Sequence, residues 1–484
     1  MFGFHKNLKN VPMQYQLNIS GKHFKQLQSH LLPGDGKEAV AVALCGRLNH
    51  KGLHRMVVHE LLLVPHQECE RDEHRVSWRT DKILPLLNRA SKANMAILKI
   101  HSHPGGYEGF SLVDDESDGK LFPSIFGWVD SDLPHASAVM LPDGKIFGRM
   151  FFSDMSNESI SQVLVAGDTI QLWNYESVLD LDLEFGKRVT QAFGERTFAF
   201  LRKLRIGVVG CSGTGSPVIE QLVRLGVGEL VLVDPDHIEL KNLNRILNSR
   251  KADAEHMNLK VEMLKAAIDK MDLGANVIAY SSNLFDDTEC LMDLATCDLI
   301  FGCVDSVDGR DLLNRVATYY GLPYFDLGIK LEADGLGGIS KIVGTVNYLQ
   351  PGQSSLMSRG FYDAEDLKAA GLFRIDPLGF SELVKNSYIK NINVNRPAVI
   401  SINMMVASYA VNEFLNRIHP YKAELCAEYA QSTIDFTEAC FVHVSEQNLE
   451  VDRFLEAKVG LGDRNVLLDT VELSPRQNEV EERI

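Results

Sequence analysis

The stretch from Leu201 to Asp236 constrains the fold of this chain more than any other. It begins with the apolar run LRKLRIGVVG and continues through the glycine turn CSGTG into SPVIEQLVRLG, where apolar residues recur at helical spacing. A second apolar run, ELVLVDPD, follows and ends in acidic residues. Strand, glycine turn, helix and strand in this order make a βαβ unit, which predicts a parallel sheet with helices on both faces.

The glycine turn predicts a nucleotide site. Gly210, Gly213 and Gly215 would let the backbone approach a phosphate at the start of the helix, where unpaired N–H groups bind anions. Asp234 follows about 20 residues later, at the position from which a carboxylate reaches ribose hydroxyls. Such a turn is also typical of nicotinamide dehydrogenases, but Ser212 replaces the central glycine of their motif.

The residues after the second strand favour a different family. DPDHIELKNLNR, a lysine in NLKVEML, and DLIFGCVDSVDGR follow one another. In this order they resemble the adenylating domain of ubiquitin-activating enzymes and of their bacterial relatives ThiF and MoeB, over about residues 176 to 420. The resemblance implies that a protein C-terminal carboxylate is joined to the α-phosphate of ATP, with release of pyrophosphate. That reaction requires cations along the triphosphate and a carboxylate for magnesium.

The same resemblance implies roles for individual side chains that bind the nucleotide or its magnesium ion. They are Asp234, Asp236, Asn242, Arg245, Lys260 and Asp305. Arg245 and Lys260 would face the phosphates, and Asp305 would hold magnesium. Asp234 and Asp236 would hold the nucleotide, while Asn242 would fix its loop. Arg310 follows where the family has an arginine.

A further arginine implies a dimer. The segment EFGKRVTQAFGE resembles the leading helix of the family, whose arginine reaches the ATP of the partner subunit. Arg188 stands at that position. The resemblance therefore implies a homodimer formed through the adenylation domain.

The relay cysteine of many relatives is missing. It lies between the magnesium aspartate and the C-terminal part of their domain, but no cysteine occurs here from Val304 to Leu425. The acyl-adenylate would pass directly to an external nucleophile, or to a thiol supplied by Cys426, Cys440 or a partner such as a conjugating-enzyme-like protein. We expect the segment from Gly360 to Asn393 to shield the adenylate from water.

The structural zinc ligands of the family are also incomplete. Ser355 and Ser358 replace its first C-x-x-C pair, and only Cys440 and His443 represent the second. One thiol and one imidazole cannot fill a four-ligand site. We therefore expect no structural zinc in this half of the chain.

The segment HSHPGGYEGFSLVD, from His101 to Asp114, predicts a metal site in the other half. It follows the strand-like run MAILKI, so His101 and His103 would point to the same face, and a Pro-Gly-Gly turn could return Asp114 toward them. Two imidazoles and one carboxylate are the ligand set of a catalytic zinc with an open position. A structural interpretation remains, because Ser111 and Asp114 could instead form a capping box.

This spacing resembles the signature of the JAMM (MPN+) metalloproteases, which cleave ubiquitin-like conjugates. The resemblance covers roughly residues 15 to 155 and implies that Glu38 is the general base and that Ser111 donates a hydrogen bond to the oxyanion. Glu60 is the one serious rival for the base. The implied cofactor is zinc, which lowers the pKa of bound water to about 7.

Composition limits the remaining classes. A chain of 484 residues exceeds a single core, and a net charge of −16 opposes nucleic-acid binding, which requires basic surface. The sequence contains no run of about 18 apolar residues, so it predicts no membrane span. The 8 cysteines include no C-x-x-C pair and the start MFGFHKNLKN lacks a secretory apolar core, which together favour a reduced, cytoplasmic protein.

These patterns predict a two-domain α/β enzyme. We expect a JAMM-like zinc peptidase domain over residues 1–160, a Rossmann-like adenylation domain over 161–425, and an extension and tail over 426–484. One chain would trim or release a ubiquitin-like protein and adenylate its C-terminus, as in bacterial conjugation systems, some of which are linked to antiphage defence. Two alternatives are an adenylating enzyme for sulfur-carrier or peptide modification, and a scaffold in which one or both sites are inactive.

Overall fold

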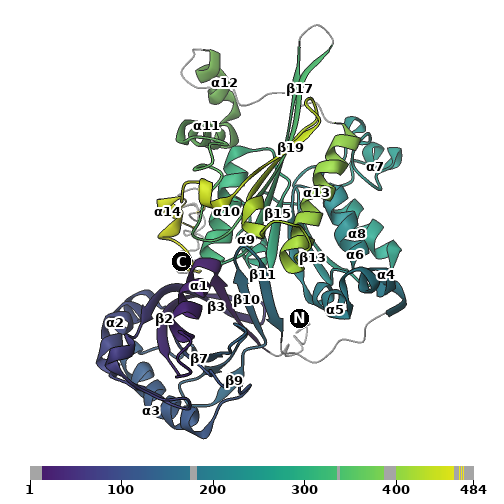
Figure 1. Cartoon of the computed structure of the whole chain (residues 1–484). Coiled ribbons are helices and arrows are strands. Elements are labelled where there is room, and N and C mark those ends of the chain that lie inside the picture. The colour runs from purple at the N-terminus through teal and green to yellow at the C-terminus, as the bar shows by residue number, and fades with distance from the viewer. Residues whose placement is uncertain are drawn as a thin grey trace, which may run out of the picture. The chain divides into compact units, whose positions relative to one another are not determined.

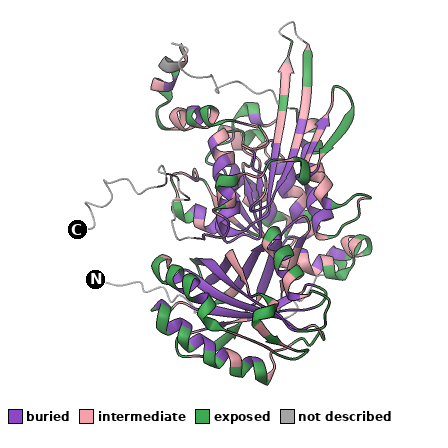
Figure 2. Ribbon diagram, turned by 60° about the vertical axis from the view of Figure 1, so that its left-hand side comes forward, coloured by how far each residue is buried: buried purple, intermediate pink, exposed green. Residues whose placement is uncertain are grey.

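The structure is a computed structural model that describes residues 13–174, 183–334, 338–385 and 399–462, together with Leu468, Thr470 and Leu473. The chain divides into two compact units. Unit 1 comprises Met1–Val165, Leu172–Ser177 and Gly460–Val466; unit 2 comprises Ala166–Gln171, Val178–Val459 and Leu467–Ile484. In each unit the central strands are buried (Figure 2).

Unit 1 is built on a nine-stranded sheet in the order β11-β10-β1-β3-β2-β6-β7-β8-β9 (Figure 1). The strands are β1 (Gln14–Ser20), β2 (Val40–His50), β3 (Leu53–Leu63), β6 (Ala96–Ser102), β7 (His135–Met140), β8 (Ile146–Phe151), β9 (Asn157–Ser159), β10 (Gln162–Ala166) and β11 (Ile170–Asn174). The helices are α1 (Gly21–Leu31), α2 (Leu84–Ala93) and α3 (Leu112–Val129). A separate hairpin pairs β4 (Cys69–Arg71) with β5 (Val76–Trp78), and short 3-10 turns occur at η1 (His66–Glu68) and η2 (Thr80–Ile83).

The pairing of β2 with β6 positions the histidines of unit 1. Both strands are rich in apolar residues and almost wholly buried, as expected for central strands covered on both faces. They run antiparallel with Val40 opposite His101. The main chain of Ala39 continues the pairing, since its carbonyl accepts from the Ser102 N–H at 3.0 Å. Residues just before β2 therefore lie beside the end of β6.

Unit 2 is built on an eight-stranded sheet in the order β14-β13-β12-β15-β16-β17-β18-β19 (Figure 1). The strands are β12 (Arg205–Val209), β13 (Glu229–Val233), β14 (Asn276–Tyr280), β15 (Leu299–Gly302), β16 (Tyr324–Ala333), β17 (Ile339–Leu349), β18 (Gln431–Asp435) and β19 (Cys440–Val444). The helices are α4 (Leu183–Phe193), α5 (Glu195–Lys203), α6 (Gly215–Leu225), α7 (Lys251–Glu255), α8 (Lys260–Met271), α9 (Thr288–Ala295), α10 (Val307–Tyr320), α11 (Ala364–Ile375), α12 (Pro377–Lys385), α13 (Ile400–Ile418) and α14 (Arg453–Glu456). The 3-10 turns are η3 (Leu240–Asn242), η4 (Cys426–Tyr429) and η5 (Glu446–Asn448).

The predicted βαβ unit is present as β12, α6 and β13, with β12 and β13 parallel. The five strands from β14 to β16 are all parallel, which confirms a Rossmann-like sheet. Beyond β16 the sheet differs from the expectation, because β17, β18 and β19 are antiparallel. The reason is that β16 and β17 are adjacent in sequence, with no crossover helix between them, so the chain returns as a hairpin.

Strand order places a crevice next to β12. Its neighbours are β13, the next strand in sequence, and β15, reached after the chain has crossed the sheet. The order therefore reverses between β12 and β15, and ligands of such sheets bind outside the carboxyl ends of the strands at this point. None of the helices in the described ranges is long and apolar enough to cross a membrane.

Candidate functional site

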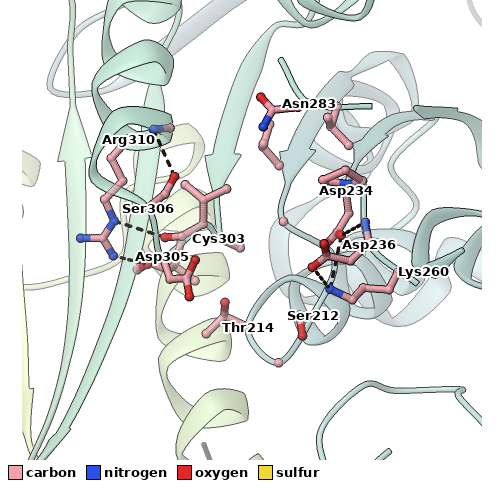
Figure 3. Close-up of a pocket in the computed structure, with 18 of the residues that line it drawn as sticks. Ser212, Thr214, Asp234, Asp236, Lys260, Asn283, Cys303, Asp305, Ser306 and Arg310 are labelled. Atoms are coloured by element: carbon pink, nitrogen blue, oxygen red, sulfur yellow. Dashed lines mark hydrogen bonds and ion pairs between the residues drawn. The ribbon is translucent and has the colours of Figure 1, made fainter. Parts of the chain in front are cut away.

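A cavity of about 510 Å³ opens at the carboxyl ends of β12, β13 and β15. The glycine turn, the acidic residues after β13 and the residues after β15 all contribute to its wall (Figure 3). The cavity thus lies at the switch point of the sheet, and it brings together segments that are distant in sequence. Of the residues expected to bind the nucleotide, Asp234, Asp236, Asn242, Arg245 and Lys260 line it.

The glycine turn is shaped by its close packing. Gly210 has φ +90, and a Cβ there would lie 2.6 Å from the Cys303 carbonyl oxygen, so the turn and the end of β15 can approach only with glycine at this position. Gly215 starts α6, and a Cβ on it would overlap the Gly210 carbonyl. The turn therefore leads directly into the N-terminus of α6. There the Ser216 and Val218 N–H groups already donate to the Ser212 and Thr214 carbonyls, so the N–H groups that face an anion are those of the turn itself.

A buried ion cluster holds the acidic end of β13. Asp234 is 5% exposed, and its carboxylate accepts from the main-chain N–H groups of Cys211 and Asp236 at 2.7 and 3.0 Å. Lys260 Nζ lies 3.3 Å from Asp234 and 2.6 Å from Asp236. Burial raises the pKa of Asp234. Burial acts to lower the pKa of Lys260, but the two carboxylates outweigh it, so this pKa is raised and Lys260 stays charged.

Asn242 fixes the loop that carries Arg245. It is 4% exposed, and its side-chain oxygen accepts from the Glu239 N–H at 2.9 Å in a capping box around η3. Its carbonyl accepts from the Arg245 N–H at 3.0 Å. The Arg245 guanidinium donates to the Lys241 carbonyl and to Asn244, and it makes no ion pair with any described carboxylate. A positive charge is thus available at the cavity wall.

Asp305 follows β15 and is exposed at the cavity, on the same side as Arg310 (Figure 3). The Arg310 guanidinium is fixed by one carboxylate and two main-chain carbonyls. Its Nε lies 3.3 Å from the fully buried Asp326 and 3.2 Å from the Val304 carbonyl, and Nη2 donates to the Leu327 carbonyl at 3.1 Å. Because Arg310 donates to the carbonyl of Val304, the residue before Asp305, it can position the Asp305 carboxylate.

Arg188 does not line the cavity of its own chain. It lies on α4 with an exposed side chain, and its Nη1 donates to Gln191 at 2.9 Å. The structure therefore does not bring Arg188 together with the other nucleotide-site candidates.

Two lining residues, Arg374 and Asn403, were missed by sequence reasoning. Arg374 of α11 lies 3.7 Å above the Phe285 ring and pairs with Asp308 at 2.8 Å, and Asn403 of α13 packs against Gly213. They come from helices far along the chain, and no local motif marks them. Arg374 also places α11, part of the segment expected to cover the adenylate, at the rim of the cavity. Residues 386–393 of that segment lie outside the described residues.

Ser355 and Ser358, which stand where the resemblance places the first zinc pair, make hydrogen bonds. The Ser355 hydroxyl donates to Asp452 at 2.6 Å, and the Ser358 hydroxyl donates to the Glu450 carbonyl at 2.8 Å. Cys440 and His443 are exposed on β19. Neither belongs to the metal-ligating cluster found among the described residues.

That cluster, in unit 1, consists of His101, His103 and Asp114. One potential ligand atom from each lies within 4.8 Å of the others, and all three side chains are buried. His101 Nε2 is 2.8 Å from Asp114 Oδ1, and His103 Nε2 is 3.4 Å from Asp114 Oδ2. His103 Nδ1 lies 2.9 Å from the Tyr107 carbonyl, so with the proton on Nδ1 the Nε2 lone pair faces the cluster.

The capping box considered from sequence is also present. The Ser111 hydroxyl accepts from the Asp114 N–H at 3.2 Å, and the Ser111 N–H donates to Asp114 Oδ2 at 2.7 Å. The same box that begins α3 thereby aims the Asp114 carboxylate at the two imidazoles. The structural and the metal-binding interpretations are compatible, because one carboxylate serves both. Hydrogen bonds from the histidines outweigh burial and hold the pKa of Asp114 below its usual range.

Glu38, not Glu60, adjoins the cluster. Glu38 precedes β2 and its Oε1 lies 3.9 Å from His103 Nε2. It is 5% exposed, and burial raises its pKa to about 7. Glu60 is paired with Arg89 of α2, with 44% of its side chain exposed. Two imidazole nitrogens, a carboxylate and a second carboxylate within reach fit a zinc ion with three protein ligands and an adjacent base.

Comparison with known proteins shows which proteins unit 2 is similar to. The ThiF family matches residues 186–448. Among curated proteins, ubiquitin-like modifier-activating enzyme 5 of Bombyx mori is 28% identical over 166 residues, which are 32% of this chain and 39% of that protein. The adenylyltransferase and sulfurtransferase UBA4 of Meyerozyma guilliermondii is 32% identical over 149 residues, 30% of this chain and 34% of that protein. The chain therefore spans well under half the length of these relatives.

Among solved structures, E. coli MccB with ATP has a TM-score of 0.42 at 17% identity, covering 57% of this chain and 74% of MccB. The ThiF match extends over more than half of the 484 residues and includes the glycine turn, the ion cluster around Asp234, and Asp305. The chain accordingly belongs to the ThiF family.

Proposed function

We propose that this chain is an ATP-dependent adenylating enzyme that acts on the C-terminal carboxylate of a ubiquitin-like protein and that also carries a zinc peptidase for the same partner. The observation that carries the first activity is the cavity at the switch point of unit 2. Membership of the ThiF family supports it. Nine of the residues assigned from the sequence line that cavity or start the helix behind it: Gly210, Gly213, Gly215, Asp234, Asp236, Asn242, Arg245, Lys260 and Asp305.

Each group has a part in positioning the nucleotide. The N–H groups of the glycine turn at the start of α6 bind phosphate oxygens, and Arg245 neutralises charge along the triphosphate. Lys260 keeps Asp234 ionised, so that this carboxylate can accept from ribose hydroxyls. Asp305 is the residue that would hold magnesium, which supplies further neutralisation of the phosphates.

The test of adenylation is ATP–pyrophosphate exchange in the presence of a small protein that ends in glycine and is encoded beside this chain. We expect exchange to require magnesium and to fall on the order of 100-fold or more in Asp305→Ala and Arg245→Ala. Asp269→Ala, an exposed aspartate of α8, is the matched control and should keep full exchange. Exchange that survives Asp305→Ala would contradict the assignment.

The second activity rests on the convergence of His101, His103 and Asp114 beside Glu38. In this proposal the three ligands hold zinc, whose chemistry is activation of a water molecule. Glu38 would accept a proton and pass it to the leaving amine, for which a pKa of about 7 is well matched. Ser111 is close enough to Asp114 to orient it, and its hydroxyl is the proposed oxyanion donor.

The test of the peptidase combines metal content with cleavage of the same small protein carrying a C-terminal extension. We expect one zinc per chain, lost in His103→Ala. Glu38→Ala should retain zinc and lose cleavage by about 100-fold or more. Glu60→Ala is the matched control, since it removes a carboxylate of the same sheet that is paired with Arg89, and it should cleave normally. Full cleavage by Glu38→Ala would exclude Glu38 as the base.

One alternative keeps adenylation and changes the acceptor. The UBA4 relative is named an adenylyltransferase and sulfurtransferase, which favours sulfur-carrier chemistry as the second candidate. The product distinguishes the two, because a sulfur carrier leaves as a thiocarboxylate and a conjugated protein as an amide. Mass spectrometry of the small protein after turnover with ATP reads out this difference. A scaffold with inactive sites would give neither product.

A further inference from the structure

We infer that Asn403 and the N-terminus of α13 bind the phosphate chain of ATP, a contact that rests on the proposed adenylation and adds a residue to it. Asn403 is 4% exposed, lies in the first turn of α13 and lines the cavity. A Cβ placed on Gly213 would overlap its amide nitrogen and would lie 3.1 Å from Arg245 Cδ. The amide thus sits against the glycine turn and beside the arginine assigned to the phosphates.

The Asn403 side chain has no hydrogen-bond partner among the described residues. Its main-chain N–H donates to the Val399 carbonyl at 3.0 Å, which is the first bond of the helix. A side-chain amide that is almost fully buried normally finds partners for its N–H and oxygen atoms. Because this one borders a cavity, the missing partner is a ligand of that cavity.

The beginning of α13 is itself suited to an anion. The N-cap residue is Val399, which provides no side-chain cap, and the first turn contains no acidic residue. The N–H groups of Ile400, Ser401 and Ile402 precede the first intrahelical bond, and the helix extends over 19 residues, so its dipole is fully developed. The helix end and the unpartnered amide are independent features, and both favour negative charge.

The position within the cavity indicates which part of ATP is bound. Ser212 and Thr214, which flank Gly213, lie on the opposite side of the cavity from Asn283 (Figure 3). The acids that suit the ribose, Asp234 and Asp236, are engaged by Lys260. Asn403 belongs to the side of the glycine turn and Arg245, where phosphates are expected. α13 packs against α6, and Asn403 in its first turn lies against Gly213 of the turn that leads into α6.

The experiment is calorimetric titration of the full chain with Mg·AMPCPP, a non-hydrolysable ATP analogue, and separately with adenosine. Asn403→Asp preserves the size of the side chain and places a negative charge against the phosphates. We expect it to weaken Mg·AMPCPP at least about tenfold and adenosine less than about twofold. Asn403→Ala should weaken Mg·AMPCPP about threefold to tenfold, because it removes the hydrogen bond without adding repulsion.

The control is Asn412→Asp on the exposed face of the same helix, which should bind both ligands as the wild type does. Normal Mg·AMPCPP affinity in both Asn403 variants would overturn the inference. Equal weakening of Mg·AMPCPP and adenosine would also overturn it, since a purely structural role affects the whole cavity. A wild-type chain that binds no Mg·AMPCPP would contradict the adenylation proposal itself, an outcome distinct from failure of Asn403 alone.

Discussion

At the scale of single residues, burial decides the protonation of Glu38. The carboxyl is almost fully enclosed beside the metal-ligating cluster, and burial raises its pKa from 4.5 to about 7. Asp114, only a few ångströms away, has a lowered pKa because His101, His103 and the Ser111 N–H lie against its carboxylate. Under the proposed peptidase function, Glu38 would exchange a proton and Asp114 would remain an anion.

The raised pKa of Glu38 predicts a pH-dependent stability in the metal-free protein. Between pH 4.5 and about 7 the folded state holds a proton that the unfolded state releases, so the associated stability is complete below pH 4.5 and is lost as pH rises through 7. Glu38→Gln cannot titrate. In excess chelator, we expect the wild type to lose on the order of 2 kcal/mol more unfolding free energy than Glu38→Gln between pH 5 and pH 8.

Tryptophan fluorescence during urea denaturation measures this difference selectively. All 3 tryptophans, Trp78, Trp128 and Trp173, belong to unit 1. Parallel pH profiles for the wild type and Glu38→Gln would show that Glu38 titrates near its ordinary value. Glu60→Gln serves as the control and should follow the wild type.

At the scale of elements, a buried polar network connects η5 to the loop after β17 in unit 2. Glu446 of η5 accepts from the Ser354 N–H and hydroxyl at 3.0 and 2.6 Å and pairs with Arg359 at 3.1 Å. The Arg359 side chain is fully buried, and burial lowers its pKa to about 10. Together with the Ser355 and Asp452 bond, these contacts attach residues 446–452 to the loop after β17.

Removal of Glu446 should therefore lower the free energy of unfolding. Glu446→Ala leaves the buried Arg359 cation without its carboxylate, and we expect a loss of about 3–5 kcal/mol in unfolding free energy. Glu450→Ala, an exposed neighbour whose main chain alone is used, should lose less than about 0.5 kcal/mol. Thermal unfolding followed by far-ultraviolet circular dichroism compares them, and equal midpoints would show that the network does not stabilise unit 2.

At the scale of the whole molecule, unit 1 contains a cluster of potential metal ligands and unit 2 contains the cavity proposed for the nucleotide. The cavity contains only part of the catalytic set proposed for it. Arg188 is exposed and outside the cavity of its own chain. Of the 8 cysteines, all of which lie in the described ranges, only Cys440 is exposed. Both features predict properties that depend on partner molecules.

Subunit complementation tests the origin of Arg188. If two copies form a dimer and Arg188 acts on the partner's ATP, mixing Arg188→Ala with Asp305→Ala chains creates one complete site in each mixed dimer. With free exchange of subunits, about a quarter of wild-type pyrophosphate exchange should return, since half of the dimers are mixed and each has one intact site of two. No recovery, once subunit exchange is demonstrated, would place Arg188 in its own site or outside the reaction.

The absence of a relay cysteine predicts that no thioester accumulates on this chain. Burial raises the pKa of Cys426, and raises that of Cys303 to about 12, so neither thiol supplies a thiolate at neutral pH. After incubation with ATP and the small glycine-ended protein, a non-reducing gel should show no reductant-sensitive adduct. An adduct that disappears in Cys440→Ala would identify a displaced relay cysteine on β19.

The sequence by itself determined the local features of both sites. The glycine turn, the strand pattern around it and the H-x-H spacing depend on residues a few positions apart, where backbone geometry alone dictates which side chains share a face. The same is true of the Ser111 and Asp114 box, whose three-residue spacing is that of a helix start. Sequence also predicted the parallel part of the sheet in unit 2, but not its antiparallel extension, because the direction of β17 depends on a hairpin instead of on periodicity.

Only the tertiary structure decided which distant residues meet these local features. The choice of Glu38 over Glu60 follows from the register of β2 on β6, and a sequence does not state a register. Asn403 and Arg374 reach the nucleotide cavity from α13 and α11, and Glu446 reaches Arg359 from η5, across separations of the chain that no motif spans. Such contacts form because packing of helices and strands brings their side chains together, so their identity is a property of the folded sheet and not of any short segment.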